Sequence, residues 1–170
     1  MRLRPALALA AGVALVVATG CDALTGVDGG PPPAEVTLAS GLRLSVSAAP
    51  TAVRSGDSLT LRVVVRNPTG APVTVTSGCS ALALLGVARA DGRESRLSAG
   101  LGCYASPRTF TLGPDESVAA EDRLVVRDFA GGAAAPGTYV VRGYSQLPGD
   151  ARTDSRNEAL PNAEARFEVR

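Results

Sequence analysis

Apolar and polar side chains alternate most clearly in residues 55–76, SGDSLTLRVVVRNPTGAPVTVT. Successive side chains of a strand point to opposite faces, so the alternation from Leu59 to Arg66 predicts a strand with one face on a core. Asn67-Pro68-Thr69-Gly70 ends this strand because proline has no N–H to donate and glycine accepts positive φ. Val73 and Val75 resume the alternation. We therefore predict two strands joined by a tight turn, with the rest of the domain arranged around them.

Further segments show the same alternation. The residues from Val36 to Val46 predict either one strand or a strand pair kinked at Gly41. Residues 82–89 are apolar on both parities, so periodicity alone does not separate a strand from a helix, and the hairpin dipeptide Asp91-Gly92 favours a strand. Other predicted strands lie within residues 110–112, 118–127, 139–144 and 163–170. The side chains predicted to face inward in the segments beginning at 118 and 163 are Val118, Ala120, Leu124, Val126, Ala163, Ala165, Phe167 and Val169.

These segments amount to about seven or eight short strands, with no convincing long helix between them. The prolines from Pro50 onward all fall between the predicted strands, where a missing backbone donor costs least. Residues 146–162 are polar and contain Pro148-Gly149-Asp150, so we expect an exposed loop there. The fold class predicted for residues 35–170 is therefore all-β, an immunoglobulin-like antiparallel β-sandwich.

The first 20 residues predict an export signal that is not part of the fold. Arg2 and Arg4 make a positive start, and the apolar run from Ala6 to Val17 is short for a membrane span. The run leads through small residues to Cys21, a pattern that resembles the bacterial lipoprotein signal, in which this cysteine is lipidated; an ordinary secretory signal is the alternative. We expect Cys21 to anchor the protein to a membrane of the cell envelope, on its periplasmic or extracellular face, with residues 21–34 as a Gly/Pro-rich linker.

The distribution of charged residues argues against a nucleic-acid partner. Of the 17 basic residues, Arg2 and Arg4 leave with the signal peptide, so 15 remain, all arginine, against 16 acidic ones. Because these arginines alternate with acids and form no basic stripe, we expect no nucleic-acid partner. A hydrophobic content of 45% with only 4% aromatic residues predicts a folded domain with an aliphatic core.

Export also bears on the two remaining cysteines, Cys79 and Cys103. In an oxidising compartment such a pair is bridged more often than free, and a bridge that closes a loop of about 25 residues stabilises by roughly 3–4 kcal/mol. Two reactive thiols or a metal site are the alternative, but the chain has no histidine and no C-x-x-C spacing. We therefore predict a Cys79–Cys103 disulfide and no metal site.

Four motifs occur in a fixed order, namely RNPTGAPV at 66–73, DGR at 91–93, LGPDES at 112–117 and PGTYVVRG at 136–143. Together they resemble the BsuPI-type domain of the intracellular proteinase inhibitors, over roughly residues 42–145. The resemblance implies an immunoglobulin-like fold and proteinase inhibition through protein binding. The spacing of Gly137, Tyr139 and Val141 is similar to a tyrosine corner, in which the phenol bonds to nearby backbone. The chain departs from the family in its export signal and in residues 94–107, which contain Cys103 where the family usually has aromatic residues.

The motifs that suggest catalysis are incomplete. The absence of histidine removes Ser-His-Asp and Cys-His catalysis. Residues 56–59, GDSL, match the esterases of that name, but without the histidine that activates the serine they predict only a turn that enters a strand at Ser58. Gly100-x-Gly102 lacks the third glycine and the following helix of a phosphate-binding loop. We therefore expect no enzymatic activity and no cofactor.

Three polar clusters allow an alternative use. One offers oxygen ligands for calcium without the order of an EF-hand and consists of Asp150, Asp154, Asn157 and Glu158. Arg152 and Arg156, in the same predicted loop, would suit a trypsin-like protease. A second acidic group consists of Asp115, Glu116, Glu121 and Asp122. A solvated surface explains each cluster, so none is predicted as a site.

The predicted function is protein binding by loops at one end of the sandwich, where rigid strands hold variable connections. The best-placed candidates are the loop from Asp128 to Gly137 and the disulfide-tethered stretch that ends at Pro107. The first hypothesis is proteinase inhibition, which the resemblance implies. The second is a structural or assembly module of the cell envelope, because fold similarity does not choose a function. The partner is unknown, and we expect a monomer.

Overall fold

Every regular element in the described part of the chain is a β-strand. The computed structural model describes residues 33–91, 106–128, 130–150, 152–153 and 159–170. The strands found there are β1 (Ala34–Thr37), β2 (Arg43–Ala49), β3 (Ala52–Val53), β4 (Ser58–Arg66), β5 (Val73–Ser77), β6 (Ala83–Arg89), β7 (Arg108–Leu112), β8 (Ser117–Val125), β9 (Gly137–Ser145), β10 (Arg152–Thr153), β11 (Ala159–Leu160) and β12 (Ala163–Val169). Across these residues, no helix has the length and apolar character needed to span a membrane.

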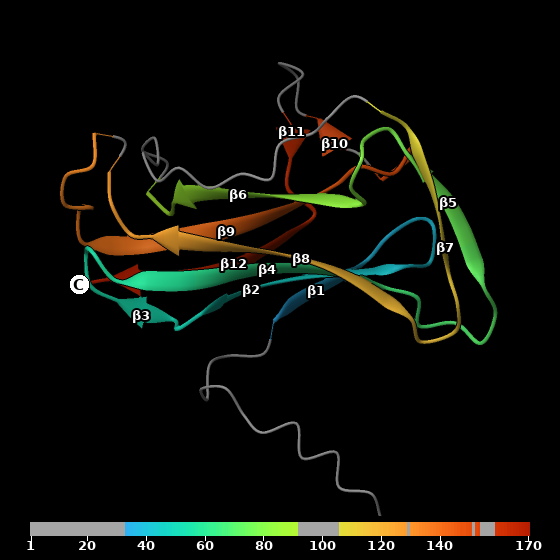
Figure 1. The fold of residues 1–170 in the computed structure, drawn as a ribbon, viewed down its shortest axis with the longest axis horizontal. Coiled ribbons are helices and arrows are strands. Elements are labelled where there is room, and N and C mark those ends of the chain that lie inside the picture. Colours follow the sequence, from blue (N-terminus) through green and yellow to red (C-terminus); the bar gives the residue numbers. More distant parts are fainter. Residues whose placement is uncertain (1–32, 92–105, 129, 151, 154–158) are drawn as a thin grey trace, which may run out of the picture.

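Two four-stranded sheets pack face to face, as Figure 1 shows. The first sheet has the order β1-β2-β4-β8 and the second has the order β3-β12-β9-β6. Neighbouring strands are antiparallel, except that β3 runs parallel to β12. Edge strands β1 and β3 belong to one open side of the sandwich, and edge strands β8 and β6 belong to the other. The predicted all-β immunoglobulin-like sandwich is confirmed.

The core between the sheets is mostly aliphatic, as the composition predicts. In β4, Leu59, Leu61, Val63 and Val65 are all at most 2% exposed, while the residues between them are more exposed. The aromatic part of the core is a stacked pair, with ring centroids 5.4 Å apart, formed by Tyr139 of β9 and Phe167 of β12. The alternation of β4 and β12 therefore marks the inner face as expected.

Residues 34–49 form a hairpin, so the strand-pair alternative for this segment is correct. The turn between β1 and β2 is closed by the Leu38 N–H, which donates to Leu42 O at 2.8 Å, and Gly41 takes a φ of +82° there. Positive φ is a conformation that glycine adopts without strain. The predicted kink is a full reversal of the chain.

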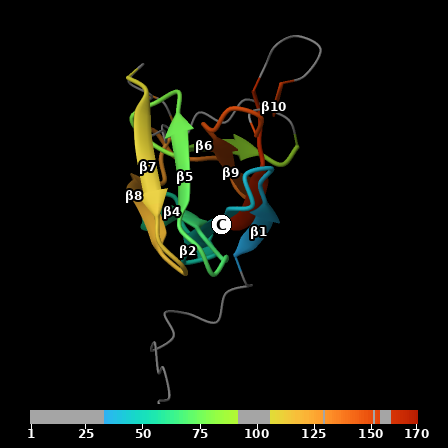
Figure 2. The same ribbon diagram turned by 90° about the vertical axis from the view of Figure 1, so that its right-hand side faces the viewer.

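The two strands predicted from residues 55–76 are confirmed, but β5 leaves the sheet that holds β4. It pairs with β7 from Val73↔Leu112 to Ser77↔Arg108, and this two-stranded ribbon stands across one end of the sandwich (Figures 1 and 2). Asn67 fixes the corner at which the chain turns, because its fully buried side chain donates to Leu112 O and Gly113 O, both at 3.0 Å. One polar side chain thus joins the β4–β5 turn to the end of β7.

Three details differ from the sequence prediction. Residues 146–162 are not wholly an exposed loop, since Leu147 is 2% and Asp150 is 6% exposed. Val118 faces the predicted side but is 38% exposed, because its position on the edge strand β8 leaves it partly uncovered. Pro50 lies between strands as predicted, but it is followed directly by β3, a strand that the sequence did not predict and that transfers the chain from the first sheet to the second.

Candidate protein-binding site

The loop that joins β8 to β9 lies at the end of the sandwich where the C-terminus also lies (Figure 1). Sequence analysis places the first candidate site here, from Asp128 to Gly137; residue 129 is outside the described residues. The loop starts beside the β3–β4 turn, since the Val126 N–H donates to Asp57 O at 2.9 Å and the Gly56 N–H donates to Val126 O at 2.8 Å. Its first residue is therefore fixed to the sheet.

The first half of the loop is a closed turn around Asp128. The Asp128 N–H donates to Gly132 O, and the Gly131 N–H donates to Asp128 O, both at 3.0 Å. The Asp128 carboxylate also accepts a hydrogen bond from the Gly132 N–H. A Cβ on Gly132 would lie 2.9 Å from that carboxylate, so a larger residue at this position would have to displace the Asp128 side chain. The sequence of the loop matches its backbone conformation.

The second half is attached to the body of the domain through two side chains. Ser55 Oγ accepts a hydrogen bond from the Ala134 N–H at 2.9 Å, and Ala134 is only 5% exposed. The Tyr139 hydroxyl donates to Ala135 O at 2.9 Å, which confirms the predicted tyrosine corner. The described loop residues that remain exposed are small, namely residues 130–133, 135 and 136. These described residues therefore present backbone in a fixed shape, with only small side chains in front of it.

A cation lies beneath this loop. The Arg89 guanidinium is 5.4 Å from the centre of the Tyr139 ring and forms an ion pair with Asp91 at 3.0 Å. The pKa of Arg89 is raised above its ordinary value, first by the hydrogen bond to Asp91 and also by Tyr139. The arginine stays charged, and its contact supports the ring that holds Ala135.

The second candidate, the stretch that ends at Pro107, lies almost entirely outside the described residues, together with Cys103 and Cys21. Cys79 is fully buried and disulfide-bonded, and its N–H donates to Ser77 Oγ at 3.2 Å. The pairing of Cys79 with Cys103 and the lipidation of Cys21 stay predictions.

The GDSL motif has the structural role that the sequence predicts. Gly56 has a φ of +94°, and the Asp57 carboxylate accepts a hydrogen bond from the Arg54 N–H at 2.9 Å. Ser58 is then the first residue of β4. These contacts describe a turn that enters a strand.

The calcium candidate loses its one described carboxylate to a structural contact. Asp150 accepts hydrogen bonds from the Ala39 N–H and from Ser40 Oγ, so it fastens the β1–β2 turn to the β9–β10 connection. Asp154, Asn157, Glu158 and Arg156 lie outside the described residues, as does the side chain of Arg152. Within the described residues no group of three metal-binding side chains is present.

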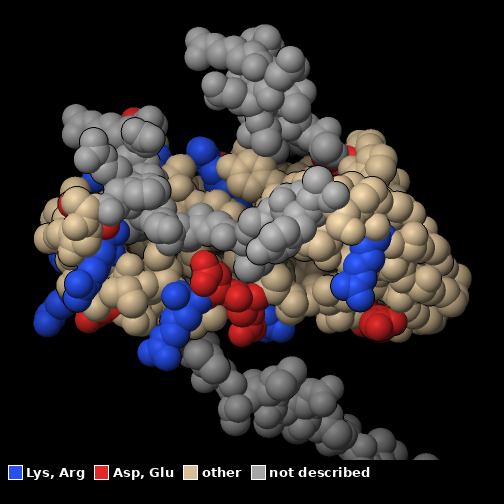
Figure 3. Space-filling view, turned by 45° about the horizontal axis from the view of Figure 1, so that its top comes forward, with Lys and Arg blue, Asp and Glu red and all other residues tan. Residues whose placement is uncertain are grey.

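Two residues of the second acidic group form ion pairs on the surface. Asp115 pairs with Arg66 at 2.7 Å, and Glu121 pairs with Arg62 at 3.2 Å. Arginine and acidic side chains are interspersed on the face seen in Figure 3, without a large area of one sign. The prediction of a solvated acidic surface therefore fits residues 115 and 121.

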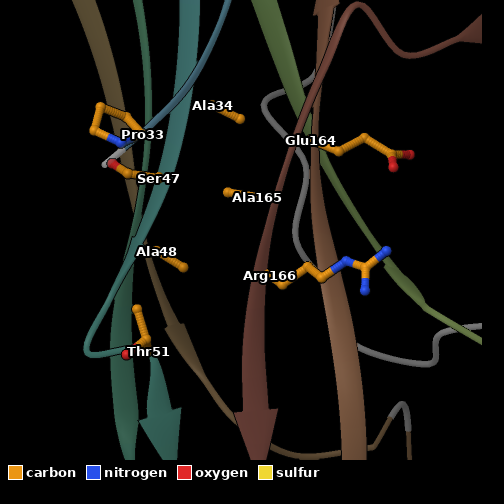
Figure 4. A pocket seen from close by; sticks show the side chains of 8 residues that line it. All are labelled: Pro33, Ala34, Ser47, Ala48, Thr51, Glu164, Ala165 and Arg166. Atoms are coloured by element: carbon orange, nitrogen blue, oxygen red, sulfur yellow. The ribbon is translucent and has the colours of Figure 1, made fainter. Parts of the chain in front are cut away.

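Sequence reasoning missed two pockets, one at each open side of the sandwich. The first has a volume of about 290 Å³ and lies between β2 and β12, with Ala34, Ala48 and Ala165 lining it. Figure 4 shows the side chains of Glu164 and Arg166 pointing away from it. The second has a volume of about 260 Å³ and lies beside β8. Alternation marks which side chains face inward, but it does not show where two sheets separate at their edges.

Comparison with known proteins gives no family for this chain. No protein-family model and no curated protein matches it. A DNA glycosylase of Pseudomonas fluorescens is 18% identical with a TM-score of 0.41, over 76% of this chain and 30% of that one. A β-glucosidase of Erythrobacter marinus is 18% identical with a TM-score of 0.40, over 76% of this chain and 15% of that one. The CARDB domain of a Pyrococcus furiosus protein is 18% identical with a TM-score of 0.36, over 74% of this chain and 84% of that one. Similarity at this level gives no ground for inferring an activity.

Proposed function

We propose that this chain is a lipid-anchored envelope protein whose β-sandwich binds a protein partner through the Asp128–Gly137 loop. The observation that supports the proposal is the set of exposed small residues at 130–133, 135 and 136, in a loop held by Ser55, Asp128 and Tyr139. A loop that is already fixed loses little conformational entropy when it binds. Its glycine and alanine residues let a partner approach the backbone closely.

Proteinase inhibition is the form of binding that the BsuPI resemblance favours. An inhibitor loop must keep one shape in the cleft of the protease and must resist cleavage there. The hydrogen bonds at Ser55 and Tyr139 hold the adjacent residues Ala134 and Ala135, and the Asp128 carboxylate closes the turn that precedes them. Because the described exposed residues include alanines but no arginine, we expect a protease that accepts a small side chain rather than a trypsin-like one.

The test begins with the full chain in detergent micelles and a set of purified endopeptidases, including one that cleaves after alanine and trypsin as the contrast. Inhibition of peptide cleavage, with the chain recovered intact, is the result we expect for the first enzyme. Tyr139→Phe should weaken that inhibition, because it frees Ala135 O and leaves the ring in place. Thr74→Ala, on an exposed strand of the end ribbon, is the matched control.

A structural or assembly role is the second candidate. The described part of the loop contains no aromatic residue, whereas tight interfaces usually contain Trp, Tyr or Arg anchors. Recovery of envelope assembly components from solubilised membranes, with no effect on any protease in the set, would support this role and exclude inhibition.

A further inference from the structure

Strand β8 is an edge of the first sheet, and the direction of its backbone groups follows from the contacts at its end. The Val126 N–H donates to Asp57 O, and Val126 O accepts from the Gly56 N–H, so residue 126 points toward β4. Alternate residues of an antiparallel strand point the same way, so the even-numbered residues of β8 pair with β4. The residues whose N–H and C=O then point to the outer edge are Ser117, Ala119, Glu121, Arg123 and Val125. Among the described strands, none pairs with that edge.

The same strand also carries exposed apolar side chains. Val118 is 38% and Val125 is 45% exposed, and they are the large hydrophobic residues found exposed among those described. The pocket of about 260 Å³ opens beside the first half of β8, between residues 118–120, Phe110 of β7 and residues 80–83. An incoming strand would therefore find unpaired backbone groups next to a cavity for an apolar side chain.

Charge on β8 disfavours the charge-matched pairing of this strand with a second copy of itself. Asp122 lies opposite Leu61 in the β4–β8 register, so its side chain is on the inner face, the same face as Val118 and Ala120. A two-fold pair of β8 strands that matched Glu121 with Arg123 would place Asp122 against Asp122. Like charges directly opposite each other destabilise a strand pair, and an inward charge is one way in which edge strands avoid self-association.

We propose that β8 binds an extended segment of a partner protein as an added strand. One apolar side chain of that segment enters the pocket beside Val118 and Ala120, and one Arg or Lys side chain lies opposite Asp122. The two side chains share a face, so they stand two or four residues apart in the partner. Backbone hydrogen bonds supply affinity in such complexes, and side-chain pockets supply specificity. This site is separate from the Asp128–Gly137 loop and does not depend on protease binding.

The experiment selects a phage-displayed library of random nine-residue peptides against the full chain in detergent micelles. We expect the enriched peptides to carry an apolar and a basic residue two or four positions apart. Hydrogen exchange resolved to single amides should then slow at least tenfold at Ala119 and Glu121 when a synthetic copy of an enriched peptide binds. The amides of Val118 and Ala120 already face β4, so their exchange should change little.

Two variants distinguish pairing through backbone hydrogen bonds from non-specific peptide binding. Ala119→Pro removes one outward N–H, and proline is tolerated at the solvent side of an edge strand, so peptide affinity should fall more than tenfold without unfolding. Asp122→Asn should remove the enrichment of basic residues while leaving the apolar preference. Thr74→Ala on β5 is the control and should leave peptide affinity unchanged. The unfolding midpoint of each variant confirms that the fold is kept.

Three results would overturn the proposal. The first is a selection that enriches no peptide sequence, and the second is a peptide whose affinity is unaffected by Ala119→Pro. The third is a concentration-dependent dimer that Ala119→Pro abolishes, because it would assign this edge to a second copy. The protease assay with Tyr139→Phe tests the Asp128–Gly137 loop alone, so its outcome does not depend on any of these three results.

Discussion

At the scale of single residues, two buried polar side chains hold segments that are far apart in the sequence. The Asn67 amide donates to Ala71 O, Leu112 O and Gly113 O, and its carbonyl oxygen accepts from the Thr69 N–H and hydroxyl. Asp150 accepts from the Ala39 N–H, 111 residues away. Each side chain satisfies backbone groups that a buried turn would otherwise leave unpaired.

Asn67→Ala should destabilise the fold by about 3 kcal/mol, because it removes the partner of several carbonyl and N–H groups around a fully buried position. Denaturant unfolding of the variant and of the parent protein gives the difference directly. Thr74→Val is the control: it removes an exposed hydroxyl that bonds Thr111 at 3.0 Å, and its effect should stay within about 0.5 kcal/mol. Equal effects of the two substitutions would contradict the role given to Asn67.

Asp150→Ala should destabilise by about 2 kcal/mol, since a hydrogen bond to a charged acceptor contributes about 1.5–3 kcal/mol. We expect the loss of stability to appear first in the β1–β2 turn, which Asp150 contacts. Hydrogen exchange at Ala39 should accelerate more than exchange at the centre of β4. Ser40→Ala removes only the longer contact, of 3.3 Å, and should have the smaller effect. Faster exchange throughout β4 with no excess at Ala39 would contradict the local role.

Both residues show where sequence analysis stops at this scale. Asn67 precedes proline and Asp150 follows glycine, so each has the local sequence of an ordinary exposed turn. Their burial depends on partners 45 and 111 residues away, and no local pattern contains that information. The contact of Tyr139 was predictable, because its acceptor, Ala135 O, is only four residues away along the chain.

At the scale of elements, the close approach of the two sheets depends on Gly143 of β9. A Cβ at this position would lie 2.6 Å from Val46 Cγ1 and 3.0 Å from Leu44 Cδ2, both on β2 of the opposite sheet. Glycine in the middle of a strand weakens it in isolation, but here it lets a facing valine fill the core. The packing of the sheets therefore explains a residue that strand propensity disfavours.

Gly143→Ala should destabilise by about 1–3 kcal/mol through overpacking. The second substitution Val46→Ala removes the methyl group that the new Cβ would meet. The double variant should therefore lose less stability than the sum of the two single variants, by at least about 0.5 kcal/mol. Thermal or denaturant unfolding of the four proteins measures this coupling. Strict additivity would show that β9 shifts away from β2 instead of being compressed.

Strand positions follow from alternation, whereas strand partners do not. β4 and β12 show the period of two along their whole length, so their inner faces are evident from the sequence. β5 has the same pattern, yet it pairs with β7 because the Asn67 corner turns the chain out of the first sheet. Val118 shows that the pattern gives the direction of a side chain, but exposure depends on whether the opposite sheet extends over it.

At the scale of the whole molecule, the two proposed binding surfaces lie on different parts of the sandwich. The Asp128–Gly137 loop lies at the end near the C-terminus, while the pocket beside β8 opens on the side where β8 and β6 are the edge strands. The all-β class followed from the strand pattern and the placement of the prolines. The surface at the β8 edge could not be predicted in this way. It depends on the order of the strands in the sheets, which brings together residues 80–83, 110 and 118–120.

The disulfide at Cys79 bears on two properties of the whole molecule, its cellular location and the stability of its domain. Cys79 is fully buried and disulfide-bonded, and it lies between β5 and β6, at the passage from the end ribbon to the second sheet. We expect peptide mapping of the exported protein without reductant to recover a Cys79–Cys103 linked peptide, with Cys21 carrying lipid. Reduction should lower the free energy of unfolding by roughly 3 kcal/mol, because the bridge restricts the unfolded chain. Cys79→Ala with Cys103→Ala should reproduce that loss and remove the sensitivity to reductant. Recovery of both cysteines as alkylatable thiols from the exported protein would exclude the pairing and weaken the argument for export.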